Sequence, residues 1–208
     1  MKQKAEIKNI IFDFGGVIIN IDYQMTVAAF KQLGILNFEE QFSKLRQSHL
    51  FDELEKGIIT SIEFFERIRK ITDAPVTDRQ ITEAWNAILL DLPKQNIDFL
   101  VSLKSKYRLF LLSNTNEIHE SAFMKMIEEK FGEDVLKKIF ERVYLSHHLK
   151  RRKPDPEIFR HVVNENNLVA EETLFVDDSP QHIEGAKVAG LQTFYFEKGK
   201  TLQDIFLT

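Results

Sequence analysis

Residues 8–18 read Lys-Asn-Ile-Ile-Phe-Asp-Phe-Gly-Gly-Val-Ile, and this stretch decides the fold class of the chain. Its apolar run ends at one acid, Asp13, and two glycines follow after Phe14. An apolar run that ends in glycines predicts a short buried strand leading into a turn. Taken alone, Asp13 suits a turn residue. Three further polar groups, each placed after a similar apolar run, favour a functional role instead.

Length, composition and charge narrow the classes of protein. The 208 residues are enough for one domain, or for one domain with a small insertion, and the 18 phenylalanines predict an aromatic-rich core. A net charge of −4 with one short basic run, residues 150–153, argues against a nucleic-acid partner. The absence of cysteine excludes disulfides and thiolate metal sites. We find no membrane-span or signal-peptide pattern, and therefore expect a cytoplasmic protein without a membrane partner.

The second part of the chain, from Tyr23 to about Leu92, carries helix patterns and no strand pattern. Thr60 and Thr77 each begin a capping-box sequence, in which Glu or Gln follows three residues later. We expect helices over residues 23–33, 38–45, 48–56, 61–71 and 78–90. Residues 22–92 are therefore predicted to be a helical cap with a core of its own, inserted into a domain made of residues 1–21 and 93–208.

After Pro93 the pattern alternates between helices and apolar strands. One helix is expected to bury Ile97, Leu100, Val101 and Tyr107. Strands are expected over residues 108–112, 142–146, 173–176 and 193–196, with helices between them. This alternation predicts an α/β fold in three layers, with a parallel sheet covered by helices on both faces.

Polar residues follow the predicted strands where each strand ends. They are Asp13, Ser113 and the pair Asp177-Asp178, and Lys153 lies in the loop after the third strand. Ligands of open α/β sheets bind beyond the carboxyl ends of the strands, so these groups are expected to meet there. Carboxylates suit Mg²⁺, while a lysine and a hydroxyl suit a phosphate that the metal bridges. An aspartate beside Mg²⁺ can attack phosphorus and form an aspartyl-phosphate.

Four motifs carry a resemblance to a known family: Asp13-Phe-Gly-Gly-Val-Ile, Ser113-Asn-Thr-Asn, Lys153-Pro-Asp-Pro-Glu-Ile-Phe and Val176-Asp-Asp-Ser. In this order, with a helical insertion after the first, they resemble the haloacid dehalogenase-like (HAD) hydrolase superfamily over nearly the whole chain. The resemblance implies a Rossmann-like core with a small α-helical cap. Within the superfamily, the chain is most similar to bacterial sugar-phosphate phosphatases of the glucose-1-phosphate type.

The resemblance also implies roles for the motif residues. Asp13 would be the nucleophile and a Mg²⁺ ligand. Ser113 and the backbone around Asn114 would bind the phosphoryl group of a small phosphorylated substrate, and Lys153 would neutralise that group and Asp13.

The metal ligands implied by the resemblance include one departure from the family pattern. Asp178 would bind Mg²⁺ directly, and Asp177 would bind it through water or orient Asp178. Most phosphatases of the family carry a second Asp, two residues after the nucleophile, as general acid and base. Here that position is Gly15, whose carbonyl can bind Mg²⁺ but cannot move a proton. Since general acid–base help contributes roughly 10²- to 10⁴-fold, we expect a preference for good leaving groups such as anomeric phosphates.

Other functions remain open alternatives to a phosphomonoesterase. A dehalogenase would use the same aspartate on carbon, but it needs no metal and would not need Asp177-Asp178. A phosphomutase normally requires the acid that Gly15 lacks. A non-enzymatic relic that binds phosphate ligands or a partner is supported by Gly15 alone.

Several residues have simpler interpretations. Ser113 also suits a helix cap and Lys153 a solvated basic run. Trp85 is expected in the core of the cap, and His147-His148 is expected to be a loop or surface pair without a metal. Residues 47–53 are expected to face the site from the cap.

Overall fold

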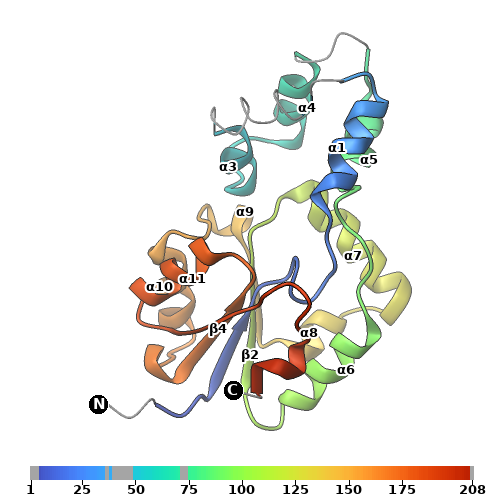
Figure 1. Cartoon of the computed structure of the whole chain (residues 1–208). Coiled ribbons are helices and arrows are strands. Elements are labelled where there is room, and N and C mark those ends of the chain that lie inside the picture. Colours follow the sequence, from blue (N-terminus) through green and yellow to red (C-terminus); the bar gives the residue numbers. More distant parts are fainter. Residues whose placement is uncertain (1–4, 36–37, 39–48, 71–74, 207–208) are drawn as a thin grey trace.

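A five-stranded parallel sheet forms the centre of the computed structural model, which describes residues 5–35, 38, 49–70 and 75–206 (Figure 1). The strand order is β3-β2-β1-β4-β5. The strands are β1 Asn9–Phe12, β2 Arg108–Ser113, β3 Arg142–Leu145, β4 Thr173–Asp177 and β5 Gln192–Tyr195. Each expected strand is present, with its ends shifted by one residue at most, so the α/β prediction is confirmed.

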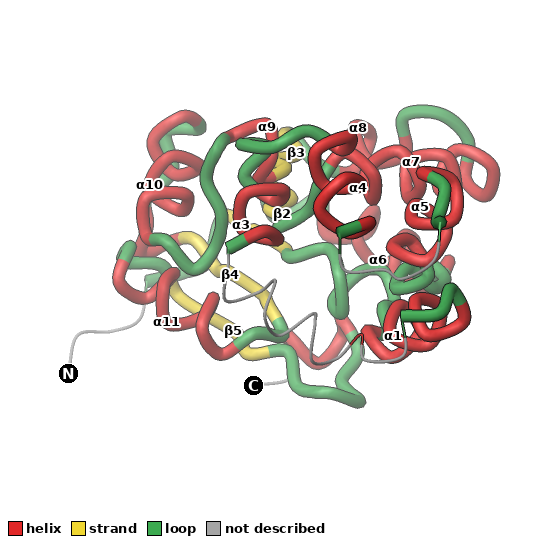
Figure 2. The backbone as a smooth tube through the Cα atoms, turned by 90° about the horizontal axis from the view of Figure 1, so that it is seen from above, coloured by secondary structure: helices red, strands yellow, loops and turns green. Residues whose placement is uncertain are grey.

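The two faces of the sheet are covered by different helices because alternate residues of each strand point to opposite sides. Ile10 and Phe12 belong to the apolar cluster that includes α6, α7 and α8, whereas Ile11 belongs to the cluster that includes α10 and α11 (Figure 2). The bounds are α6 Lys94–Leu103, α7 Glu117–Phe131, α8 Val135–Ile139, α10 Pro156–Glu165 and α11 Pro180–Val188. This is the expected three-layer arrangement.

A separate group of helices lies beyond the carboxyl ends of the strands (Figure 1). Its described helices are α1 Tyr23–Gln32, α3 Leu50–Glu55, α4 Ser61–Arg69 and α5 Asp78–Asn86. Their buried apolar residues, among them Phe30, Phe64 and Trp85, form a cluster distinct from the two on the sheet. Both expected capping boxes are present, at Thr60 and Thr77. The helix expected over residues 38–45 lies, apart from Phe38, outside the described residues.

Two connections join these helices to the sheet, and they run antiparallel to each other. Ile21 forms a β-bridge with Leu89, and the amide of Asp22 donates to the carbonyl of Ile88 at 2.9 Å. This pairing corrects the expected helix over residues 78–90, which ends at Asn86 instead. Backbone groups after Asn86 bond across the two connections rather than along a helix.

The buried face of α6 also differs from the expectation. Ile97 and Leu100 are buried, but Val101 is 52% exposed, so its prediction as a core residue is wrong. Tyr107 lies after the end of α6 and packs at the edge of the sheet core. Ile97, Leu100 and Leu103 form the buried stripe of α6 at intervals of three residues, and Val101 lies outside this stripe. Within the described part of the chain, no helix has both the length and the apolar character needed to cross a bilayer.

Candidate active site

The sequence motifs meet at the carboxyl edge of the sheet. Asp13 directly follows β1, Ser113 is the last residue of β2, and Asp177 is the last residue of β4. Lys153 lies between α10 and the short helix α9, Ser146–Leu149. The central strands β2, β1 and β4 are neighbours, so their ends place these side chains around one point.

A buried ion cluster forms the base of the site. The Lys153 side chain is fully buried, and its Nζ lies 2.7 Å from Asp13 Oδ1 and 2.7 Å from Asp177 Oδ2. Asn114 fixes the position of the lysine backbone, because its Nδ2 donates to the Lys153 carbonyl and its Oδ1 accepts from the Lys153 amide, both at 2.9 Å. The Asn114 side chain thus positions Lys153, while the expected phosphoryl binding by its backbone stays a prediction.

Asp177 has further partners that the sequence did not indicate. His182 Nδ1 lies 3.0 Å from Asp177, and the Ser179 amide donates to Asp177 Oδ1 at 2.7 Å. Burial disfavours the charge of Asp177, but Lys153 and His182 together hold its pKa below the ordinary value. His182 follows the last motif on the first turn of α11, and no local pattern distinguished it from a surface histidine.

The other two carboxyls carry raised pKa values. Burial and the nearby charge of Asp177 raise the pKa of Asp13 to about 7, although Lys153 opposes the shift. The same two causes raise the pKa of Asp178 to about 6. Three acids beside one lysine therefore leave uncompensated negative charge at this edge of the sheet.

The donor set fits a hard divalent cation such as Mg²⁺. Ligand atoms of Asp13, Asp177 and His182 lie within 4.8 Å of one another. Gly16 leaves the space that Asp178 occupies, since a Cβ on Gly16 would lie 2.2 Å from Asp178 Oδ2, and the glycine has a φ of +77°. Oxygen ligands and excess negative charge make Asp13, Asp177 and Asp178 the candidates for holding the ion.

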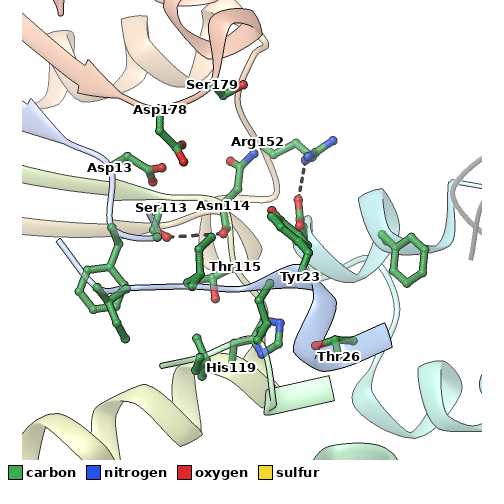
Figure 3. A pocket seen from close by; sticks show the side chains of 18 of the residues that line it. Asp13, Tyr23, Thr26, Ser113, Asn114, Thr115, His119, Arg152, Asp178 and Ser179 are labelled. Carbon is green, nitrogen blue, oxygen red and sulfur yellow. Dashed lines mark hydrogen bonds and ion pairs between the residues drawn. The ribbon is translucent and has the colours of Figure 1, made fainter. Parts of the chain in front are cut away.

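A cavity of about 660 Å³ extends from these acids toward the helices above the sheet. Asp13, Ser113 and Asp178 lie at one end, and Tyr23, Thr26 and Arg152 lie toward the other (Figure 3). Ser113 Oγ donates to the Asn114 carbonyl at 3.5 Å, which is a weak bond. Asp13, Ser113, Lys153 and Asp177 are therefore brought together as the sequence predicted.

The upper wall of the cavity comes from α1, α3, α5 and α7. Phe51 and Asp52 line it, which agrees with the expectation for the described part of residues 47–53. Trp85 is in the apolar cluster of the helices, as expected, and also lines the cavity. Its ring stacks on those of Phe51 and His119, with a 5.3 Å centroid distance to each. Burial lowers the pKa of His119 to about 3.

Arg152 links the sheet side of the cavity to α3. Its Nε lies 2.7 Å from Glu55 Oε2, and its Nη1 pairs with Asp52 Oδ1. All three side chains line the cavity. Asp52 lies within the range 47–53 that was expected to face the site. No local pattern indicated Arg152 or Glu55, because Arg152 stands in a basic run beside Lys153 and Glu55 lies beyond that range.

Of the two histidines after β3, His148 lies at the surface as expected, with 60% of its side chain exposed, whereas the expectation for His147 is wrong. Both lie in α9 rather than in a loop, and His147 is buried with 7% exposure. His147 Nε2 and His148 Nε2 lie 2.9 and 3.1 Å from Glu120 Oε2, outside the cavity. His147 is buried because α9 packs against α3, a contact that no local pattern shows.

Comparison with known proteins agrees with this geometry. A family model described as "haloacid dehalogenase-like hydrolase" matches residues 7–190. A D-ribitol-5-phosphate phosphatase of Bacteroides thetaiotaomicron is 34% identical over 193 residues, which is 93% of each chain.

Solved structures are similar over nearly the whole chain. A HAD family enzyme of B. thetaiotaomicron, crystallised with magnesium and inorganic phosphate, has a TM-score of 0.86 at 38% identity and covers 96% of this chain and 99% of that one. A predicted HAD-like family hydrolase from Porphyromonas gingivalis has a TM-score of 0.85 at 31% identity, with 97% of both chains covered. The chain belongs to the haloacid dehalogenase-like hydrolase family.

Proposed function

We propose that the chain is a Mg²⁺-dependent phosphomonoesterase that hydrolyses a small sugar or polyol phosphate through an aspartyl-phosphate on Asp13. The observation that carries this proposal is the fully buried Lys153, placed 2.7 Å from both Asp13 and Asp177 at the base of the cavity. Burying a lysine and two acids costs desolvation free energy, so such a cluster is poor evidence of a purely stabilising role. Buried charged groups of this kind gather at active sites. The phosphatase name of the similar protein from B. thetaiotaomicron supports the same activity.

The chemistry requires a nucleophile that is deprotonated and held in place. Lys153 binds Asp13 Oδ1, which leaves the second carboxylate oxygen of Asp13 to attack phosphorus. The bond from phosphorus to the leaving oxygen breaks as the bond from Asp13 to phosphorus forms, and the leaving oxygen keeps the electron pair and takes a proton from solvent. Water then attacks the same phosphorus, so that inorganic phosphate leaves and the Asp13 carboxylate is restored.

The transferring phosphoryl group is stabilised by charge and by hydrogen bonds. Lys153 places a positive charge beside Asp13, and Ser113 provides a hydroxyl at the end of the neighbouring strand. When bound by Asp13 and Asp178, Mg²⁺ supplies charge that stabilises the phosphoryl oxygens. Gly15 offers no proton for the departing oxygen.

The helices between residues 22 and 92 act as a cap over the site in this proposal, with residues 1–21 and 93–208 as the catalytic core. Support comes from their separate apolar cluster and from the residues that they place on the cavity wall. A cap that closes over the cavity would exclude water until the leaving group is bound.

Phosphate release from a panel of phosphomonoesters, with and without Mg²⁺, tests the proposal. We expect Mg²⁺-dependent release that Asp13→Asn abolishes. The same substitution at Asp98, an exposed residue that pairs with Lys94, provides the matched control and should retain release. Acid-quenched wild-type protein should carry one phosphoryl group, detected by intact mass. If no ester is hydrolysed at high protein concentration, the relic alternative is favoured. Release of halide from haloacids would favour the dehalogenase.

A further inference from the structure

We propose that Asp52, Glu55 and Arg152 form a subsite for the hydroxyl groups of an uncharged polyol or sugar chain. The site would then select phosphate esters of neutral polyols and sugars over phosphorylated sugar acids and bisphosphates. The inference rests on the proposed phosphatase function and names the substrate class. It starts from three charged side chains on the wall of a cavity whose other end holds the reactive acids.

The position of the three side chains suits the leaving group rather than the phosphoryl group. Asp52 and Glu55 project from α3, whereas the phosphoryl machinery lies at the strand ends. Figure 3 shows Arg152 on the far side of Asn114 from Asp13, with Tyr23 next to Arg152. A substrate held by its phosphate at Asp13 would extend toward this cluster. The cavity of about 660 Å³ accommodates a substrate larger than phosphate alone.

The hydrogen-bonding capacity of the cluster exceeds what its internal pairs use. Arg152 contacts Asp52 through Oδ1 and Glu55 through Oε2. A carboxylate has two oxygens that together accept about four hydrogen bonds, and a guanidinium has about five donors. Each group therefore keeps capacity for a hydroxyl, which can donate to a carboxylate and accept from the guanidinium.

The charge of the cluster opposes a second anion. Two carboxylates face one guanidinium, and among the described residues on the cavity wall Arg152 is the only arginine or lysine. His119 on the same wall is deeply buried and bonds to Asn86 at 2.9 Å. A carboxylate or second phosphate at this end would add negative charge beside Asp52 and Glu55, whose side chains are 38% and 25% exposed, whereas hydroxyls carry no such penalty.

The test compares three esters with the same carbon chain length: ribitol 5-phosphate, n-pentyl phosphate, and ribonate 5-phosphate, which ends in a carboxylate. For the wild-type chain we expect kcat/KM for the polyol to exceed that of the alkyl ester by at least roughly 10-fold. It should also exceed that of the acid. In Asp52→Asn and in Glu55→Gln the polyol-to-alkyl ratio should fall by roughly 10-fold, because a hydrogen bond to a charged group is lost. The acid-to-polyol ratio should rise.

A matched control comes from the same helix. Glu53 of α3 pairs with Arg67 at 2.6 Å and does not line the cavity. Glu53→Gln should retain the wild-type ratios. Ratios within one variant cancel any change in how the cap is held, so they separate recognition of hydroxyls from a structural effect.

Binding separates the failure of this inference from failure of the proposed function. Calorimetry on full-length Asp13→Asn measures the affinity for the same three esters without turnover. If wild-type chain releases no phosphate but binding favours the polyol and Asp52→Asn removes the preference, the subsite stands and the phosphatase proposal fails. Equal ratios in wild type, Asp52→Asn and Glu55→Gln, or a wild-type preference for the acid, would overturn the subsite.

Discussion

Replacing Lys153 by methionine should destabilise the metal-free protein strongly, and more at alkaline than at acidic pH. Methionine keeps an unbranched apolar side chain and removes the ammonium group, whose Nζ lies 5.4 Å from the centroid of the Phe175 ring. The variant leaves Asp13 and Asp177 buried without the cation that now lies 2.7 Å from both.

The size of the destabilisation expected for Lys153→Met follows from the two ion pairs that the lysine forms. At 2.7 Å and an effective dielectric constant of about 20, each pair contributes roughly 6 kcal/mol of attraction, which desolvation of the ions largely offsets. Removal of one partner from a buried pair costs about 3–5 kcal/mol. We expect a loss in this range for the free energy of unfolding near pH 8, where Asp13 and Asp177 of the wild type are mostly ionised and attract Lys153.

The pH dependence comes from the acids rather than from the lysine. Burial lowers the pKa of Lys153, but Asp13 and Asp177 outweigh it and raise that pKa above the ordinary value. The stabilisation by Lys153 is therefore complete below its unfolded pKa and is lost only in strong alkali. The pKa of Asp13, about 7 in the wild type, should rise further without the lysine. A proton then neutralises Asp13 at acidic pH, and the destabilisation should be at least about 1 kcal/mol smaller near pH 5.5.

Urea unfolding of metal-free wild type and variant at both pH values measures these losses. Lys187→Met is the control, since Lys187 forms an exposed pair with Glu184 and should cost no more than about 1 kcal/mol. Equal losses for Lys153→Met at both pH values would refute the reasoning, as would a loss below about 1 kcal/mol near pH 8.

Three further predictions concern the metal, the leaving group and the support of the lysine loop. Mg²⁺ must displace protons from Asp13 and Asp178, whose pKa values are about 7 and about 6. The affinity of the protein for Mg²⁺, measured by calorimetry, should therefore rise from about pH 5.5 to about pH 8, and an affinity that does not change with pH contradicts this. Gly15→Asp should raise kcat/KM for alkyl phosphates more than for p-nitrophenyl phosphate, because an alkoxide needs a proton from the new acid more than a nitrophenolate does. Gly15→Ala is the control for added bulk, since a Cβ at this position contacts an isoleucine side chain at 3.3 Å. If Gly15→Asp changes neither class of ester, the leaving-group argument is refuted. Gly185→Ala should lower both turnover and thermal stability, because its Cβ would lie 2.1 Å from the Pro154 carbonyl next to Lys153. Wild-type values for both would show that the loop of Pro154 can shift without loss of activity or stability.

The strands could be predicted because their signals are local. Each is a run of apolar residues long enough for a buried parallel strand, and neighbours in the sheet do not change that pattern. Helix ends depended on contacts that the sequence does not show. The helix beginning at Asp78 ends at Asn86 because Ile88 and Leu89 pair with the chain entering α1. Val101 is apolar but faces outward, which periodicity alone did not distinguish from a core position.

The candidate site likewise contains residues that local patterns predict and residues that depend on contacts between distant segments. Asp13, Ser113 and Asp177 stand at strand ends, and a parallel sheet brings such ends together whatever the intervening loops do. Lys153 was chosen over its basic neighbours by its motif, and the structure buries it beside two of these residues. The roles of His182, Glu55 and Arg152 depend on packing between distant segments, so local patterns carry no sign of them, whereas Asp52 lies in the range 47–53 that was expected to face the site.

The consecutive residues Arg152 and Lys153 have very different attachments, and this difference bears on how a cap could move. Lys153 is fully buried with two ion pairs, and its backbone is fixed by the Asn114 side chain. Arg152 instead pairs with Asp52 and Glu55 of α3. Although 24% of its side chain is exposed, the two atoms of its contact with Glu55, Arg152 Nε and Glu55 Oε2, are themselves buried. A movement of α3 away from the strand ends would therefore separate Arg152 from both of its partners. It would leave the two ion pairs of Lys153 in place, because Asp13 and Asp177 belong to the ends of β1 and β4.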